Sequence, residues 1–297
     1  MELPAAFQRA MEALLGEEYP AYLASLEQPP RRGLRRNPLK CSQPQLEAAL
    51  PFALEPTAFS PLSYAFAARE EGVGRLPAHH AGLFYVQEPS ACSAVTVLAP
   101  QPGEKVLDLC AAPGGKSTQI AGLLAGEGLL WSNEIVKSRA QVLLSNVERL
   151  GVANAVVSSC HPQRLCESLQ GFFDKVLVDA PCSGEGMFRR DPAAIAQWTP
   201  ESPAACAQRQ RAILDSAAQL LKAGGRLVYS TCTFSPGGER GQRPLVPLRP
   251  PGVCAGPHRG RVWPSRPGGP AGAAHLPHGW GRGPFRGQVP AGGGKLL

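Results

Sequence analysis

Two cysteines, Cys182 and Cys232, stand where a pair of thiols could act together. Each follows a short apolar run, at residues 176–178 and 227–229, that predicts a buried strand. Side chains just past the carboxyl ends of parallel strands lie where open α/β sheets bind and transform ligands. Two thiols at that edge suit attack on an electron-poor ring and later release of the enzyme. The alternative is that both cysteines only fill the core, because free cysteine is often buried.

A glycine-rich turn at residues 107–117 joins a predicted strand to a helix. Its small residues let a ligand approach the backbone, and the helix start offers unpaired N–H groups. A phosphate-binding P-loop is excluded because Cys110 stands where that motif needs its first glycine, and the dinucleotide pattern G-x-G-x-x-G is absent. Glu134 ends the next predicted strand, where an acid commonly accepts hydrogen bonds from ribose hydroxyls. We therefore expect an adenosine-bearing ligand without a pyrophosphate, and S-adenosylmethionine fits; an ordinary surface carboxylate is the alternative for Glu134.

The chain divides into three pieces, at residues 1–100, 101–238 and 239–297. The first has apolar residues at helical spacing, followed by a basic loop and a short strand; we expect a helical and mixed module. The second alternates strands and helices and predicts a doubly wound α/β sheet of the Rossmann type. We expect its strands at 105–109, 128–131, 155–157, 173–178 and 226–229, its helices at 115–124, 137–150 and 204–221, and a turn at 222–225.

The net charge of +7 at pH 7 is misleading about partners. Residues 240–297 hold nine Lys or Arg and no Asp or Glu, which leaves 21 basic and 23 acidic residues in 1–239. An RNA-binding surface on the main body must therefore be a local patch. The four arginines between residues 28 and 37 could hold phosphates, and a solvated basic loop explains them equally well.

The sequence also indicates the cellular compartment in which we expect the protein. The chain has no charged-then-apolar leader and no apolar run near the length of a membrane span, so we expect neither secretion nor a membrane anchor. The nine cysteines contain no C-x-x-C pair, which argues against a zinc knuckle or a disulfide framework. We expect a cytoplasmic protein without a metal.

The segment 239–297 differs in kind from the rest. It holds 14 Gly and 11 Pro among 59 residues and has no apolar periodicity, so it cannot bury enough apolar surface to offset chain entropy. One interpretation is a natural disordered arginine-glycine tail that binds RNA loosely. We prefer a slipped reading frame near residues 237–240, which the nucleotide sequence would settle. In either case we expect no regular structure in 240–297.

Taken together, these motifs resemble those of the RsmF-type RNA cytosine-5 methyltransferases of the wider Sun family. The resemblance covers residues 2–238 and depends most on the two cysteine motifs in their order. The matching segments are residues 34–37, 85–91, 107–117, 132–135, 172–175, 179–189 and 229–236.

The resemblance implies a role for each matching residue. Cys232 would be the nucleophile that adds to C6 of the target cytosine, Cys182 would assist release of the product, and Asp179 would contact the cytosine near N3. S-adenosylmethionine would be the cofactor, and RNA, with small-subunit ribosomal RNA preferred over transfer RNA, the partner of a monomeric enzyme. The implied cofactor pocket is lined by Cys110, Ala111, Ala112, Pro113, Gly114, Gly115, Lys116, Glu134, Asp179 and Arg139.

The chemistry of cytosine supports the thiol assignments independently. C5 becomes nucleophilic only after a thiolate adds at C6, and a stacked base must be splayed out to enter the pocket. Arg189 and Arg190, which follow the Cys182 motif, are placed to hold flanking phosphates, or else belong to a solvated loop.

Three departures from the family leave alternatives open. The loop at residues 158–161 lacks the family's acidic or amide residue, so we assign no adenine contact there. The family's last strands and its C-terminal RNA-binding domain have no counterpart after Pro236. An RNA-binding relic without turnover is therefore the second hypothesis. A methyltransferase that acts on something other than a pyrimidine is the third, and the paired cysteines argue against it.

Overall fold

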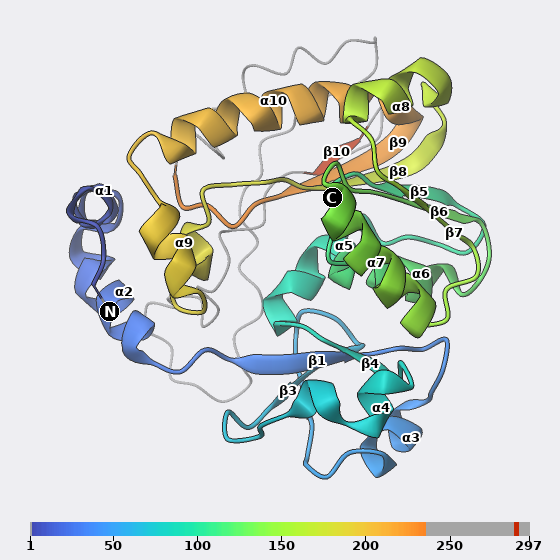
Figure 1. Ribbon diagram of the computed structural model, residues 1–297, viewed down its shortest axis with the longest axis horizontal. Helices are drawn as coiled ribbons and strands as arrows, with labels where there is room; N and C mark the ends of the chain where they lie inside the picture. The colour runs from blue at the N-terminus through green and yellow to red at the C-terminus, as the bar shows by residue number, and fades with distance from the viewer. Residues whose placement is uncertain (1, 236–287, 291–297) are drawn as a thin grey trace.

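A mainly parallel sheet of six strands forms the centre of the computed structural model, which describes residues 2–235 and 288–290 (Figure 1). The strand order is β10-β9-β8-β5-β6-β7, and all neighbours are parallel except β10 and β9. The chain leaves β5 for β6 on one side and returns to β8 on the other. Such a reversal marks the ligand-binding crevice of open α/β sheets. The strands are β5 Lys105–Asp108, β6 Leu129–Asn133, β7 Ala155–Ser158, β8 Phe173–Asp179, β9 Leu221–Ser230 and β10 Gln288–Pro290.

Helices cover both faces of this sheet, with α8 and α10 on one face and α5, α6 and α7 on the other (Figure 1). Successive strand side chains point to opposite faces. Val176 and Val178 of β8 accordingly pack with α10, while Leu177 between them packs with α5 and α6. The sequence prediction of a Rossmann-like α/β sheet is confirmed. The helices are α5 Ser93–Leu98, α6 Gly115–Leu124, α7 Lys137–Arg149, α8 Pro162–Leu169, α9 Pro192–Gln197 and α10 Ser202–Leu220.

The start of β9 differs from the sequence prediction. We expected a turn at residues 222–225 before the strand, whereas β9 spans Leu221–Ser230. The expected turn survives as an irregularity inside the strand: Phe173 pairs with Leu221, and the next pair joins Lys175 to Arg226. Gly224 adopts a φ of 81°, which L-residues rarely adopt, and allows this excursion.

The N-terminal part contains a second sheet, which is antiparallel in the order β2-β3-β1-β4. Its core is a cluster of buried apolar side chains around Leu34, Tyr64 and Phe84. The strands are β1 Arg32–Arg36, β2 Glu55–Pro56, β3 Ser63–Phe66 and β4 Phe84–Val86, and the helices are α1 Ala5–Leu15, α2 Tyr19–Glu27, α3 Gln43–Ala48 and α4 Pro77–His80. No helix in the described part of the chain is long and apolar enough to cross a membrane.

Aromatic contacts join α1 and α2 to the segments that carry the two cysteine motifs. Phe7 lies edge-on to Phe188 at 4.9 Å between ring centroids, and Tyr22 lies edge-on to Phe234 at 6.1 Å. Such pairs contribute about 0.5–1.5 kcal/mol each beyond the area that they bury. The helices α1 and α2 thus pack against the segments that follow Cys182 and Cys232 in the chain.

The segment 239–297 is described only at residues 288–290. These three residues form β10 against the free edge of β9, although we expected no regular structure there. An edge strand presents unpaired N–H and C=O groups that a short passing segment can satisfy. The other residues of the tail lie outside the described part.

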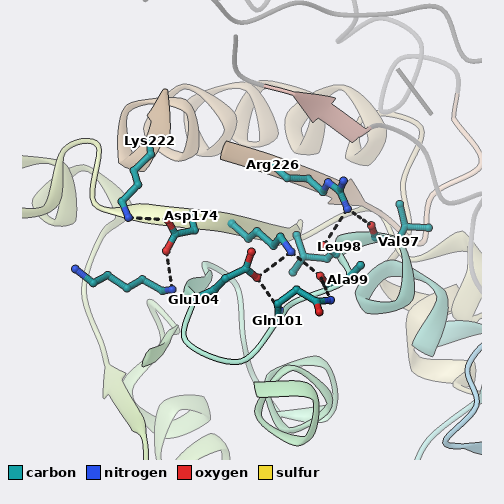
Figure 2. Close-up of polar contacts among 10 residues, drawn as sticks. Val97, Leu98, Ala99, Gln101, Glu104, Asp174, Lys222 and Arg226 are labelled. Carbon is teal, nitrogen blue, oxygen red and sulfur yellow. Dashed lines mark hydrogen bonds and ion pairs between the residues drawn. The ribbon is translucent and has the colours of Figure 1, made fainter. Parts of the chain in front are cut away.

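Ion pairs and hydrogen bonds link charged side chains near the amino-terminal ends of the parallel strands (Figure 2). Asp174 of β8 accepts hydrogen bonds from Lys222 Nζ at 2.6 Å and from the Lys105 backbone N–H at 2.8 Å. Lys175 Nζ lies 2.8 Å from a carboxylate oxygen of Glu104. Burial opposes ionisation of Asp174, but the hydrogen bonds from Lys222 and Lys105 outweigh it and lower its pKa.

We predict that Asp174→Ala lowers the free energy of unfolding by about 1 kcal/mol at pH 7, because the carboxylate is partly exposed and its bonds are screened. The lowered pKa means that this stabilisation is complete above the unfolded-state pKa and is lost as the pH falls through the folded-state pKa. Urea unfolding at a series of pH values measures the difference. Asp215→Ala, at an exposed site on α10, is the control. Equal stability of Asp174→Ala and wild type at pH 7 would contradict this role.

Candidate active site

The pairing of β8 with β9 brings the two cysteines together. The strands are parallel neighbours, and Asp179 lies opposite Ser230 in the register. Cys182 follows Asp179 by three positions, and Cys232 follows Ser230 by two. Both segments therefore leave the sheet at the same edge, where the backbone N–H of Cys232 lies 3.3 Å from Cys182 Sγ. The two cysteines thus lie in contact past the carboxyl ends of β8 and β9, which is the edge of the sheet at which we expected both thiols.

Further hydrogen bonds hold the two cysteine loops against each other. The Gly186 N–H donates to the Cys232 carbonyl at 2.8 Å. The hydroxyls of Ser183 and Thr233 lie 3.1 Å apart, and Ser183 also donates to the buried carboxylate of Glu185 at 2.8 Å. The loops thus form one bonded unit, and the spacing of the thiols does not depend on the sheet alone.

The environment of Cys182 keeps its thiol protonated. A hydrogen bond to the Cys232 side chain, followed by burial and the charge of Cys232, raises the pKa of Cys182 well above that of an ordinary cysteine. Both residues carry reduced thiols and are partly buried. Cys182 therefore retains a proton that it can direct toward the Cys232 sulfur.

An ion pair connects this centre with the glycine-rich turn. Lys116, at the start of α6, lies 2.5 Å from Asp179 Oδ2 through its Nζ atom. The Lys116 side chain is 9 % exposed and that of Asp179 31 %. Ser230 donates to the other carboxylate oxygen at 2.8 Å. Asp179 thus joins the ends of β8 and β9 to α6, near the carboxyl ends of the neighbouring strands β5 and β8.

The glycine-rich turn is shaped by close contacts that exclude larger residues. Gly114 has a φ of 110°, a conformation that favours glycine, and a Cβ atom there would lie 3.2 Å from Leu143. At Gly115 a Cβ atom would lie 3.3 Å from both Gln87 and Tyr85. Gly115 therefore lets the turn pack closely against Tyr85 of β4 and Gln87 just after it.

Arg35 supports the turn from the N-terminal sheet. Its guanidinium donates to the Gly115 carbonyl and to the Thr118 hydroxyl, each at 2.7 Å. The residue is 1 % exposed, and burial lowers its pKa to about 10. The suggestion that the arginines of this stretch hold phosphates is therefore wrong for Arg35. Its partners lie about 80 positions away in the chain, so local charge did not reveal them.

Asp108, at the end of β5, lies fully buried beneath the turn. It accepts a hydrogen bond from Ser117 at 2.7 Å, and Ser132 of β6 donates to Ser117 at 3.0 Å. Burial raises the pKa of Asp108 to about 7. The sequence analysis assigned Asp108 no role. An acid as the last residue of the strand before a glycine-rich turn is the signal that could have identified it.

Glu134, at the end of β6, and Arg139 of α7 form an ion pair that contacts the turn. Glu134 directly follows β6, and its side chain is 4 % exposed. One of its oxygens lies 3.1 Å from the Arg139 guanidinium, and the other accepts the Val136 N–H at 3.0 Å. Arg139 also donates to the Ala112 carbonyl at 3.2 Å. The pair thus binds the end of β6 to the turn.

Arg189 and Arg190 contact protein rather than extending into solvent. Arg189 donates to the Ser25 carbonyl at 3.2 Å, and Arg190 donates to the Arg31 carbonyl at 2.6 Å. Arg190 also lies 3.6 Å from the buried carboxylate of Glu88. We expected these arginines either to hold flanking phosphates or to lie in a solvated loop; the structure shows that they attach the segment after Cys182 to the N-terminal region.

The loop after β7, where no ligand contact was assigned, is held by its own hydrogen bonds. Cys160 lies with its sulfur 3.3 Å from the Asn133 side-chain oxygen, and His161 Nδ1 accepts the Gln163 N–H at the start of α8. The Cys166 sulfur lies 3.5 Å from the Ser216 carbonyl. Within residues 2–235 and 288–290, no three His, Cys, Asp or Glu side chains are grouped so that they could hold a metal ion.

Comparisons with known proteins agree with this geometry. Residues 95–242 match the family described as 16S rRNA methyltransferase RsmB/F, and residues 3–89 match the N-terminal domain of 16S rRNA methyltransferase RsmF. The ribosomal RNA small subunit methyltransferase F of Vibrio cholerae is 39 % identical over 244 residues, which are 79 % of this chain and 52 % of that protein. The chain thus spans about half the length of the curated relatives that it matches.

Two solved structures share the fold over most of the chain. A methyltransferase homologue from Pyrococcus horikoshii has a TM-score of 0.70 and 29 % identity over 82 % of this chain and 78 % of that one. NSun6 from the same organism, solved with SFG, has a TM-score of 0.77 and 22 % identity over 87 % of this chain and 90 % of that one. Two matching family models, a curated relative and a shared architecture converge on one conclusion: the chain belongs to the RsmF-type 16S rRNA methyltransferases of the Sun family.

Proposed function

We propose that this protein methylates C5 of cytosine in RNA, with small-subunit ribosomal RNA as the substrate. The observation that carries the proposal is the contact between Cys182 and Cys232 beside the Lys116–Asp179 pair. Methylation of an amine or of oxygen needs no thiol, whereas C5 methylation of a pyrimidine needs a nucleophile at C6. Membership of an rRNA methyltransferase family supports RNA as the substrate.

The turn at residues 110–116 has the properties required to hold S-adenosylmethionine. It joins the end of β5 to the start of α6, and the buried carboxylate of Glu134 stands at the end of β6, where ribose hydroxyls are commonly bound. We propose that Cys110, Ala111, Ala112, Pro113, Gly114, Gly115, Lys116, Glu134, Asp179 and Arg139 line this pocket. The bound cofactor supplies the methyl group. The protein residues hold it and keep water from the reacting carbon.

Cys232 is the proposed nucleophile. Its thiolate forms a bond to C6, and the electron pair of the C5–C6 double bond moves so that C5 becomes electron-rich. Asp179 lies at the same edge and would contact N3, where an acid favours protonation of the ring as C6 is attacked. After C5 carries the methyl group, a base removes the C5 proton, the double bond returns and the sulfur leaves as a thiolate. Cys182, which retains its proton, donates a hydrogen bond to the departing sulfur.

We propose that residues 1–100 contribute to RNA binding and that residues 101–238 form the catalytic part. A stacked cytosine must leave its helix to reach sulfurs at this depth. Transfer RNA is the alternative substrate. A ribosomal RNA substrate would place the enzyme in the cytoplasm, and we expect it to act as a monomer.

We predict that Cys232→Ala abolishes transfer of label from S-adenosylmethionine to ribosomal RNA, because it removes the thiol proposed to add to C6. Purified wild type and variant are incubated with labelled cofactor, and the RNA is digested and analysed for 5-methylcytosine. Cys41→Ala, a buried cysteine of the N-terminal sheet, controls for the loss of a thiol and should label RNA normally. Absence of 5-methylcytosine with wild type would favour the relic, which keeps the pocket without turnover.

Cys182→Ala is expected to accumulate a covalent RNA adduct, because Cys232 still attacks while expulsion of its sulfur is slowed. The adduct migrates as a retarded, cofactor-dependent band in a denaturing gel. The double variant Cys182→Ala/Cys232→Ala should lose the band. A Cys182→Ala enzyme that turns over at the wild-type rate without an adduct would refute the release role.

A further inference from the structure

Gln210 is a buried amide on the apolar face of α10. The residue is 0 % exposed, and its neighbours along the same helix face, Leu214 and Ala217, belong to the core that covers the sheet. An amide transferred from water to such surroundings costs about 1–3 kcal/mol unless it is hydrogen-bonded. The buried Gln210 amide therefore needs hydrogen-bond partners, and these partners are groups to which a hydrophobic side chain could not bond.

Two of its hydrogen bonds reach the strands that carry the cysteines. Gln210 Nε2 donates to the Pro181 carbonyl at 2.9 Å, and the Tyr229 hydroxyl donates to Gln210 Oε1 at 2.9 Å. The Pro181 carbonyl can only accept, so the amide nitrogen must face it and the amide oxygen must face Tyr229. This amide thus bridges the exit of β8 and the end of β9.

We propose that Gln210 is a positioning residue that fixes Cys182 opposite Cys232 in the reaction inferred above. Pro181 directly precedes Cys182, so a shift of its carbonyl moves the thiol. Tyr229 directly precedes Ser230, which donates to Asp179. The Gln210 amide therefore adds a buried link between the two segments at the base of the cysteine loops, and the inference depends on the proposed function only for its catalytic consequence.

The chemistry of the amide explains why other residues would not serve. An ionised glutamate only accepts hydrogen bonds and would face the Pro181 carbonyl with a second acceptor. Leucine has similar bulk but makes neither bond. Both changes release the Pro181 carbonyl, and only the glutamate can still accept the Tyr229 hydroxyl. The loop that carries Cys182 would then be held at fewer points.

The test compares Gln210→Leu with Tyr229→Phe. The second variant removes only the hydroxyl that bonds to Gln210, so it tests the same link even if Gln210→Leu does not fold. Ser216→Ala is the matched control: it removes a buried hydroxyl of the same helix that bonds to Ala212 and Gln163, away from the cysteines. Circular dichroism and binding of S-adenosylhomocysteine establish that each variant is folded. Turnover and the KM for ribosomal RNA are then measured together with the rate of Cys182 alkylation by iodoacetamide across pH.

We expect turnover of Gln210→Leu to fall about 10- to 100-fold, because displacement of a reacting group by about 1 Å has effects of that size. The KM for RNA and the affinity for S-adenosylhomocysteine should stay within about twofold. The alkylation profile of Cys182 should shift to lower pH as its contact with Cys232 loosens. Cys206 on α10 is a further titratable group in electrostatic range of Cys182, and it is unchanged in every variant.

An alkylation profile of Cys182 identical to wild type in folded Gln210→Leu and Tyr229→Phe would overturn the positioning role. So would a matching shift in Ser216→Ala. A shifted profile confined to the Gln210 and Tyr229 variants, found with a wild type that makes no 5-methylcytosine, would support the positioning role and refute the proposed function. Failure of the positioning role can therefore be distinguished from failure of the proposed function.

Discussion

The parallel register of β8 and β9 is the constraint on which the rest of the site depends. Asp179 lies opposite Ser230, so the two chain segments that follow leave the sheet side by side and bring Cys182 to Cys232. A shift of one residue would turn every side chain of one strand to the other face. The buried aliphatic residues on both faces of β8 resist that shift. Core packing away from the thiols therefore keeps Cys182 in contact with Cys232.

Buried charges complete the arrangement around this register. Lys116 and Asp179 link the glycine-rich turn to the cysteine loops, and Arg35 fixes the turn from the N-terminal sheet. Removing Asp179 would leave the charge of the largely buried Lys116 without its carboxylate partner. The N-terminal region therefore contributes directly to the shape of the proposed cofactor site. The contacts of Arg189 and Arg190 extend the same attachment to the loop after Cys182.

The sequence predicted the features that depend on local pattern. Apolar runs located the parallel strands, and the glycines located the turn and the start of α6 at Gly115. Long-range partners were beyond such reasoning: from sequence, Arg35 and Arg190 could either hold phosphates or lie in solvated loops, whereas both bond to groups of the protein. Gln210 looked like any polar residue of an amphipathic helix, since its burial depends on how α10 packs. The strand β10 was missed because a three-residue edge strand depends on its partner and has no pattern of its own.

The most direct test of the account is whether the two thiols can be joined by a short bifunctional alkylating reagent in the folded protein. The account predicts that peptide mapping by mass spectrometry finds Cys182 linked to Cys232, and that bound S-adenosylhomocysteine changes the rate of linking because the cofactor turn is adjacent. Single modification of each cysteine, or a link from Cys182 to Cys206 in place of Cys232, would contradict the shared site.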